Sequence, residues 1–544
     1  MSTSPDPPSA AGAERIALLL LTVASMLTAV AVVWLFDPLK INPDTMQLID
    51  TARHLVAGQG LSSGIVYYDA QRAFEVVPAP MIIWPPGFPW LLAAGMSVGL
   101  TAEATALASC LIAHIATTFL IYFGLRRVGA SAAIAALVGG VWLAHPTALS
   151  LTISCFAEPI YTALTLASWL ALIRALSTPP RWLAWLIASG AFAACAVLMR
   201  YTGVLWPAAA GLWLAFLAVR QRSWRPIGLA IAFGALPAIT TLALFWRNYT
   251  LNGELSGGQF DYGGSAAVGE VLRRFYWGTD LLFGSSLTSQ PLLLGAVFAV
   301  LGVAIVLLAL TLRSSEPRGL LVGLSLTKTI FLGVFLFLNA LRSSIVFVDY
   351  RYWMPVMPFV LMVIGLAADS AVSKLRVAAA ARTKLWPGAV TLSAAALAIS
   401  IFIALGKAWP LTQPHPASVV ITQALTEKLE DGRTLATVLG GSADSPHLLL
   451  SNEERRLGYI AHVAVVGLPI ARYTQHVWTS DSVGAVVSKF GISHVLFFPS
   501  TYEAEFKNPF YEDLRDGRMP DWLTVRYRGE RFVLYEVAPQ KLAR

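Results

Sequence analysis

The sequence predicts a polytopic α-helical membrane protein with a soluble α/β domain at its C-terminal end. Its 544 residues are 56% hydrophobic and only 13% charged, whereas soluble domains carry about 25% charged residues. Apolar runs of about 20 residues recur from residue 16 to residue 405, and each can cross the hydrocarbon core as a helix. After residue 405 charged residues return, which indicates a water-soluble domain over 406–544.

We expect about 11 spanning helices within residues 16–405. Their predicted ranges are 16–36, 104–124, 130–148, 158–175, 182–199, 203–219, 226–246, 291–312, 319–340, 353–372 and 386–405. The first run is too long for a secretory signal and lacks a cleavage site, so we interpret it as a retained span after a cytoplasmic tail, residues 1–15. The apolar segment 86–100 is only about 15 residues long and is predicted to be a re-entrant or interfacial helix.

Basic clusters between the predicted spans indicate the orientation. Successive clusters are separated by two spans, and they are Arg126 with Arg127; Arg174 with Arg181; Arg220, Arg222 and Arg225; Arg313 with Arg318; and Lys374, Arg376, Arg382 and Lys384. Because such loops stay in the cytoplasm, two long loops (about 37–103 and 247–290) and the C-terminal domain are expected outside. We therefore predict an inner or plasma membrane protein whose C-terminal domain is extracytoplasmic.

Few acidic residues occur in the membrane domain, and those on its expected outer side are functional candidates. Glu158 is the single carboxylate between residues 104 and 246, and an acid near hydrocarbon is costly unless it has a function. Asp44 lies just beyond the first span. Structural interpretations stay open for both: Asp44 with Gln47 fits a capping box opening a helix over 45–57, and Glu158 before Pro159 fits a helix start.

Arginines also gather on the expected outer side, against the usual charge bias, and an anionic ligand is the simplest reason. They are Arg200, Arg247, Arg273, Arg274, Arg342 and Arg351. Two have structural alternatives, because Arg200 could be a snorkelling anchor and Arg351 could pair with Asp349. Trp84 fits either an aromatic belt or a surface on which a sugar stacks.

Carboxylates beside arginines at a membrane surface suit glycosyl transfer from a lipid-linked sugar phosphate. The phosphate leaving group is already anionic, and arginines stabilise it with bidentate hydrogen bonds. One carboxylate can then deprotonate the acceptor hydroxyl as it attacks the anomeric carbon. Unlike glycoside hydrolysis, this reaction needs no acid to protonate the leaving group.

Other classes have weaker support. Leu255–Gln259 spells the signature peptide of ATP-binding-cassette ATPases, but the chain has no Gly-x-x-x-x-Gly-Lys-Ser/Thr phosphate loop. No His or Cys spacing suggests a zinc site, and the net charge of +8 comes mostly from short loops rather than from a nucleic-acid surface. A transporter or lipid flippase would show internal repeats, which are not seen. That class and an inactive scaffold stay as alternatives.

Four short motifs resemble the GT-C fold glycosyltransferases that use polyprenyl-phosphate sugars, such as protein O-mannosyltransferases and lipid A aminoarabinose transferases. Pro43–Met46 resembles their acidic motif in the first outer loop, and Trp84–Pro89 resembles the Pro-Pro segment of that loop. Ala157–Pro159 is similar to their second-loop acidic site, and Arg351-Tyr352 with Pro355 and Pro358 resembles the late Arg-Tyr-Pro motif.

The resemblance implies a GT-C membrane domain that transfers a sugar from a polyprenyl-phosphate donor to a lipid, glycan or protein outside the cytoplasm. It implies that Asp44 is the catalytic base or orients the acceptor, with Glu158 beside it, and that Arg351 contacts the lipid phosphate. Some members carry Lys before the Pro-Pro pair, where Trp84 stands here, so phosphate contact would fall to arginines. The predicted substrate-binding residues are Arg351, Arg200, Arg247, Tyr352 and Trp84, and the expected partners are the lipid-linked donor, membrane lipids and the acceptor.

The C-terminal domain is predicted to be mixed α/β. Its pattern indicates helices over 419–429 and 483–490 and strands over 434–439, 494–498 and 532–537. It contains no nucleotide-binding fingerprint. In the resembling enzymes such domains are accessory, so we expect it to shape acceptor access.

Overall fold

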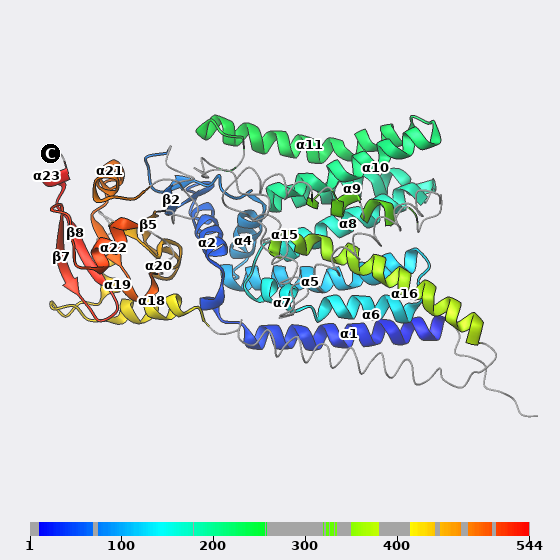
Figure 1. Ribbon diagram of the computed structural model, residues 1–544, viewed down its shortest axis with the longest axis horizontal. Helices are drawn as coiled ribbons and strands as arrows, with labels where there is room; N and C mark the ends of the chain where they lie inside the picture. Colours follow the sequence, from blue (N-terminus) through cyan, green and yellow to red (C-terminus); the bar gives the residue numbers. More distant parts are fainter. Residues whose placement is uncertain are drawn as a thin grey trace, which may run out of the picture.

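The structure is a computed structural model that describes residues 10–68, 74–177, 179–255, 257, 319, 322–325, 327–330, 332–333, 350–379, 414–440, 447–468, 477–502 and 508–542. Two parts lie end to end along the longest axis in Figure 1: a bundle of long helices and a smaller α/β domain, with α2 and α4 between them. The shared boundary between these parts is where the candidate site lies.

Long apolar helices form the bundle, which confirms a polytopic membrane protein. Seven helices in the described ranges are long and apolar enough to span a membrane, or eight with one bent pair. They comprise α1 (Ala10–Leu35), α5 (Ala102–Arg127), α8 (Glu158–Ser177), α9 (Trp182–Met199), η3 (Tyr201–Val204) with α10 (Leu205–Gln221), α11 (Arg225–Asn252), and α15 (Tyr350–Trp353) with η4 (Met354–Val356) and α16 (Met357–Ala379).

The bent pair replaces the straight span predicted over 130–148. It consists of α6 (Ala132–Leu143) and α7 (Pro146–Ile153), which meet at 50°. Pro146 cannot donate a backbone hydrogen bond, and the His145 side chain accepts from the amide of Ala148, so a new helix starts there. The predicted spans 291–312 and 386–405, and half of 319–340, lie outside the described residues.

The first outer loop is ordered around α2 (Pro43–Val56) and α4 (Gly87–Ser97). Asn42 caps α2, because its side chain accepts from the amide of Thr45. The capping box predicted for Asp44 is therefore wrong: the helix starts at Pro43, and the Asp44 carboxylate is not a cap. α4 coincides with the short apolar segment, and at about 16 Å it is too short to cross a bilayer.

A six-stranded mixed sheet forms the core of the α/β domain, in the order β2-β5-β4-β6-β8-β7. This domain is called the outer domain below, after the side of the membrane on which it is expected. The strands from the C-terminal part are β4 (Leu448–Ser451), β5 (Ala464–Gly467), β6 (His494–Phe497), β7 (Leu523–Arg528) and β8 (Val533–Val537). β2, β5, β4 and β6 are parallel, whereas β8 pairs antiparallel with β6 and β7.

Among the described residues, six α-helices accompany the sheet: α18 (Pro416–Thr426), α19 (Leu435–Leu439), α20 (Glu454–Ala461), α21 (Ser480–Phe490), α22 (Pro509–Arg515) and α23 (Pro539–Leu542). The strand predicted over 434–439 is wrong, because this segment is helix α19, capped by the Thr434 side chain on the amide of Thr437. A run this short does not distinguish strand from helix by its pattern. The predicted strands at 494–498 and 532–537 are confirmed.

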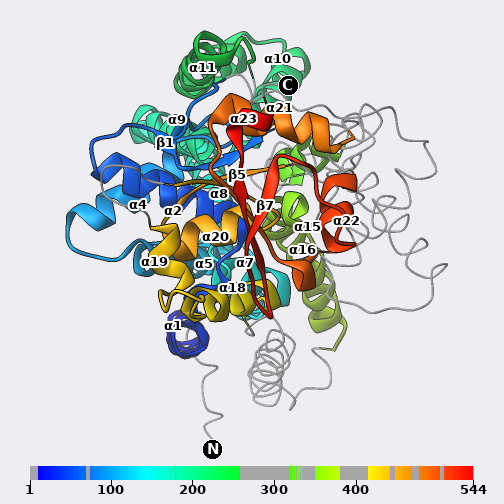
Figure 2. The ribbon, with the colours of Figure 1, turned by 90° about the vertical axis from the view of Figure 1, so that its left-hand side faces the viewer.

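One edge of this sheet comes from the first outer loop. That loop contains β1 (Ser62–Ser63), β2 (Ile65–Tyr67) and β3 (Ala79–Pro80). β2 pairs in parallel with β5, placing Val66 opposite Val466. α20 also packs against α2, and Figure 2 shows both at the centre of the outer-domain end. The first outer loop and the C-terminal part therefore form one packed unit.

Candidate active site

A small pocket lies where the first outer loop meets the ends of α8 and α9. Asp44, Glu158, Arg200 and Trp84, which were predicted as site residues, all line it. The remaining lining residues are Thr45, Leu48, Pro85, Phe88, Phe156, Ala157 and Met199. Segments far apart in the chain thus bring two carboxylates and an arginine to one place.

Glu158 and Arg200 form a buried ion pair in this pocket. Glu158 is 2% exposed and Arg200 is 8% exposed, and Arg200 Nη1 lies 2.8 Å from Glu158 Oε1. Arg200 is therefore buried and paired, not a snorkelling anchor. Within the described residues neither oxygen of Glu158 accepts a hydrogen bond. A buried pair needs further hydrogen bonds to offset its desolvation, so this carboxylate is suited to receive one from a ligand.

Asp44 lies between two arginines from distant parts of the chain. Arg351 Nη1 is 2.7 Å from Asp44 Oδ2, and Arg455 Nη1 is 2.6 Å from Asp44 Oδ1. Arg351 precedes α16, and Arg455 lies in the first turn of α20 in the outer domain. Arg455 was not predicted as a site residue. The sequence around it shows only a run of charged residues, Glu453 to Arg456.

The arginines keep Asp44 ionised. Burial alone would raise the pKa of Asp44, but Arg351, Arg455 and Arg200 more than offset burial, so the pKa lies below its usual 3.8. A carboxylate held in this way is a weak base while both cations remain on it. Its basicity rises if an incoming anion draws the arginines away.

Tyr352 and Trp84 make cation–π contacts with Arg200 and Arg351 through the faces of their rings. Arg200 lies over both rings, with its guanidinium carbon 5.5 Å from each ring centre, and Arg351 lies 5.2 Å from the centre of Tyr352. Arginines stack favourably on aromatic faces. The indole N–H of Trp84 is buried and has no hydrogen-bond partner among the described residues.

Arg247 lies in a different place from the other predicted site residues. It lines a second, wider pocket with Gln59, Leu61, Ser62, Val76, Pro78, Pro80, Thr250 and Leu251. Arg247 Nη1 donates to the carbonyl of Met81 at 2.9 Å, and the Tyr201 hydroxyl donates to the carbonyl of Ile82 at 2.9 Å. These hydrogen bonds hold the backbone of residues 81–82, just before Trp84, in place.

Gly87 lets this loop reach the end of α9. A Cβ on Gly87 would lie 2.6 Å from the carbonyl oxygen of Leu198, which is a backbone clash. Only glycine permits this close approach, which sets Trp84 beside Arg200. Within the described ranges no three His, Cys, Asp or Glu side chains gather closely enough to hold a metal ion.

Glu454, an acid next to Arg455, makes the stability of the fold depend on pH. Burial raises the pKa of Glu454 to about 7, and the charge of Arg455 only partly offsets this effect. The folded protein therefore holds a proton that the unfolded chain releases near pH 4.5. Stability contributed by Glu454 is full below pH 4.5 and falls as pH rises toward 7.

We expect Glu454→Gln to remove this loss. Relative to the unmodified protein, the variant should gain up to about 3 kcal/mol between pH 4.5 and pH 8, because one pKa unit corresponds to about 1.4 kcal/mol. Unfolding midpoints of both proteins across this range test the expectation, with the exposed Glu536→Gln as control. Parallel pH curves for Glu454→Gln and the unmodified protein would contradict it.

Comparison with known proteins gives a family match over part of the chain and a shared fold. Residues 84–246 match the family described as dolichyl-phosphate-mannose-protein mannosyltransferase. The segment contains Trp84, Glu158 and Arg200 of the pocket. No curated protein matches the sequence at a significant level.

Solved structures extend the likeness over nearly the whole chain. ArnT from Cupriavidus metallidurans in the apo state has a TM-score of 0.60 at 16% identity, over 96% of this chain and 98% of that chain. Its structure bound to undecaprenyl phosphate gives 0.57 at 15% identity, over 95% and 97%. The oligosaccharyltransferase AglB from Archaeoglobus fulgidus, with an inhibitory peptide and a dolichol-phosphate, gives 0.54 at 11% identity, over 89% and 70%. The GT-C fold predicted from short motifs is confirmed.

Proposed function

We propose that this protein is a membrane glycosyltransferase of the GT-C class that transfers one sugar from a polyprenyl phosphate to an extracytoplasmic lipid, glycan or protein. The family match over residues 84–246 and the shared fold support this class. The observation that carries the proposal is that two acids, Asp44 and Glu158, line the pocket and form ion pairs with three arginines. Relatives in the same fold bind undecaprenyl phosphate and dolichol-phosphate, which supports this donor class.

In the proposed reaction the acceptor oxygen attacks the anomeric carbon and the bond from that carbon to the phosphate oxygen breaks. The electron pair leaves with the polyprenyl phosphate, held by Arg351 and Arg200. Asp44 takes the proton from the acceptor hydroxyl once the phosphate has drawn Arg351 toward itself, and Glu158 orients the acceptor or shares this role. Tyr352 and Trp84 flank the sugar and keep the arginines in place.

The proposed topology is that of an inner-membrane protein with a cytoplasmic N-terminus, about 11 spans, a re-entrant α4 and an extracytoplasmic outer domain. Arg126 and Arg127 end α5, and Arg126 pairs with Glu14 near the start of α1. The pocket lies toward the other end of these helices, beside the outer domain. The basic ends and the acidic site thus lie on opposite sides, as the positive-inside rule requires.

The test is a reconstituted assay with sugar-labelled undecaprenyl-phosphate mannose and arabinose, and an envelope extract from a deletion strain as acceptor source. Transfer of label to the extract, with release of undecaprenyl phosphate, is the expected result. Movement of intact donor between leaflets without cleavage would favour the flippase alternative. Neither cleavage nor movement of either donor would contradict the donor assignment and favour a scaffold.

A further inference from the structure

We propose that Arg455, supplied by the outer domain, is a ligand of the donor phosphate, so that the site is complete only with this domain docked. The inference rests on the proposed function and adds a substrate contact to it. It also gives the outer domain a direct part in donor binding, in place of the accessory role expected from the resemblance.

Arg455 is positioned as a site residue. Its Nη1 atom is 2.6 Å from Asp44 Oδ1, and its side chain is 20% exposed, so it lies against a carboxylate that lines the pocket and remains reachable. Its guanidinium carbon lies 5.0 Å above the ring of Tyr67 in β2. Its Nε atom is 3.8 Å from Glu454. The side chain is thus directed at α2 by contacts from both the first outer loop and its own helix.

Arg456, the next residue in α20, has a different partner, so the orientation of Arg455 toward Asp44 is specific to Arg455. Arg456 Nη1 lies 2.7 Å from Glu453 Oε2, so its charge is matched inside the outer domain. Arg455 instead shares the Asp44 carboxylate with Arg351. The raised pKa of Glu454 leaves that neighbour partly protonated at neutral pH, so it offsets only part of the Arg455 charge.

Two arginines on one carboxylate have more hydrogen-bond donors than that carboxylate can accept, so they can also bind a second anion. Each guanidinium carries five donors in a planar fork, and a phosphate offers several acceptor oxygens. A phosphate that enters beside Asp44 would contact Arg351 from the membrane side and Arg455 from the outer-domain side. Asp44 would then be relieved of both cations, which is the condition for it to act as base.

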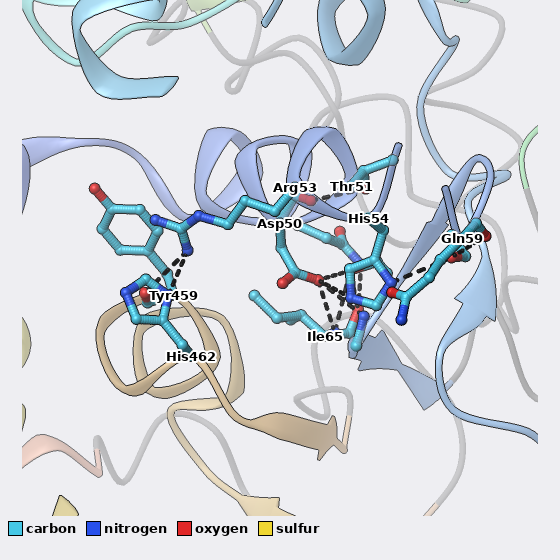
Figure 3. Close-up of polar contacts among 12 residues, drawn as sticks. Asp50, Thr51, Arg53, His54, Gln59, Ile65, Tyr459 and His462 are labelled. Atoms are coloured by element: carbon cyan, nitrogen blue, oxygen red, sulfur yellow. Dashed lines mark hydrogen bonds and ion pairs between the residues drawn. The ribbon is translucent and has the colours of Figure 1, made fainter. Parts of the chain in front are cut away.

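The outer domain is fixed well enough for Arg455 to act as a precise ligand. Figure 3 shows Arg53 reaching from α2 across to α20, where its Nη1 atom lies 2.7 Å from His462 Nδ1. Its Nη2 atom lies 3.1 Å from Glu103 Oε1 on α5, and the Tyr459 hydroxyl donates to the same oxygen at 3.1 Å. The C-terminal end of α20 is therefore tied to α2 and to α5 of the membrane domain.

Asp50 fixes β2 from the same helix. Its Oδ2 atom accepts hydrogen bonds from Ser63 Oγ at 2.7 Å and from the amide of Gly64 at 2.8 Å, as Figure 3 shows beside Ile65. β2 in turn carries Tyr67, on which Arg455 lies. Ligands on such rigid elements hold their geometry better than ligands on free loops.

The test measures equilibrium binding of undecaprenyl phosphate to the full-length protein in nanodiscs. We expect Arg455→Gln to raise Kd by about 10-fold or more, since a charge-assisted hydrogen bond contributes about 1.5–3 kcal/mol. Arg455→Lys should recover part of the affinity. The matched control Arg456→Gln should stay within about twofold of the unmodified protein. Equal Kd for Arg455→Gln and the unmodified protein overturns the inference alone, whereas no saturable binding by the unmodified protein also overturns the donor assignment.

A second pair of variants separates direct contact from an effect through Asp44. If Arg455 binds phosphate itself, adding Arg455→Gln to Asp44→Asn raises Kd again by a similar factor. If Arg455 only positions Asp44, the added change leaves Kd of the Asp44→Asn protein unaltered, which overturns the inference. Hydrogen exchange at β2 and β5 should be unchanged in Arg455→Gln. Faster exchange there together with a raised Kd would assign the loss to undocking of the domain and also count against direct contact.

Discussion

Replacing Asp44 with asparagine is expected to lower turnover by about a thousandfold, the usual range for losing a positioned base, while polyprenyl phosphate binds more tightly. The opposite directions follow from the two arginines on this carboxylate. Asparagine removes the base, and it also removes the negative charge that competes with phosphate for Arg351 and Arg455. Turnover and Kd for undecaprenyl phosphate, measured on one preparation, test both effects.

Asp37→Asn is the matched control, because Asp37 lies in the same loop but caps the short helix η1 (Pro38–Lys40) through the amide of Leu39. It should leave turnover and phosphate affinity unchanged. An unaltered unfolding midpoint for Asp44→Asn would show that the fold is intact. Undiminished turnover would remove Asp44 from the mechanism. Weakened phosphate binding would show that Asp44 supports the arginines more than it competes with phosphate.

The membrane fold follows from sequence because lipid leaves a chain few options. A segment crossing hydrocarbon must satisfy every backbone hydrogen bond internally, so long apolar runs become helices, and the predicted ranges for α1, α5, α8 and α9 agree with the observed ones. The cost of burying charge makes part of the site predictable from the sequence as well. It made Glu158 stand out in the sequence, and the structure places Glu158 in a pocket with Asp44.

The contacts between the first outer loop and the outer domain could not be predicted in this way. β2 has three residues and no periodicity of its own, and its partner β5 lies far along the chain. Arg455 has the same origin, since nothing near it in sequence indicates that α20 packs against α2. The cap of α2 was misassigned because Asn42 and Asp44 both have side chains suited to that role. Only the observed start of the helix distinguishes them.

Glu158→Gln is expected to be the most destabilising change in the site, by about 3 to 5 kcal/mol, because it leaves Arg200 buried without its counter-charge. It should also lower kcat at saturating donor if Glu158 orients the acceptor or shares the proton. Arg200→Met should destabilise for the converse reason and raise the KM for the donor. Combining both changes removes both buried charges, so the double variant should regain most of the lost stability.

The double variant separates the structural from the chemical role of Glu158. If the carboxylate serves the reaction, kcat of the double variant at saturating donor stays as low as that of Glu158→Gln and below that of Arg200→Met, although stability has returned. A kcat that returns toward the unmodified value would reduce Glu158 to a counter-ion for Arg200. Ser168→Ala in α8 is the control. Ser168 is buried, its hydroxyl donates a 2.8 Å hydrogen bond to the carbonyl of Ser189, and it does not line the pocket. It should lower the unfolding midpoint and leave kcat unchanged, so a fall in kcat for Glu158→Gln would not be a consequence of lower stability alone.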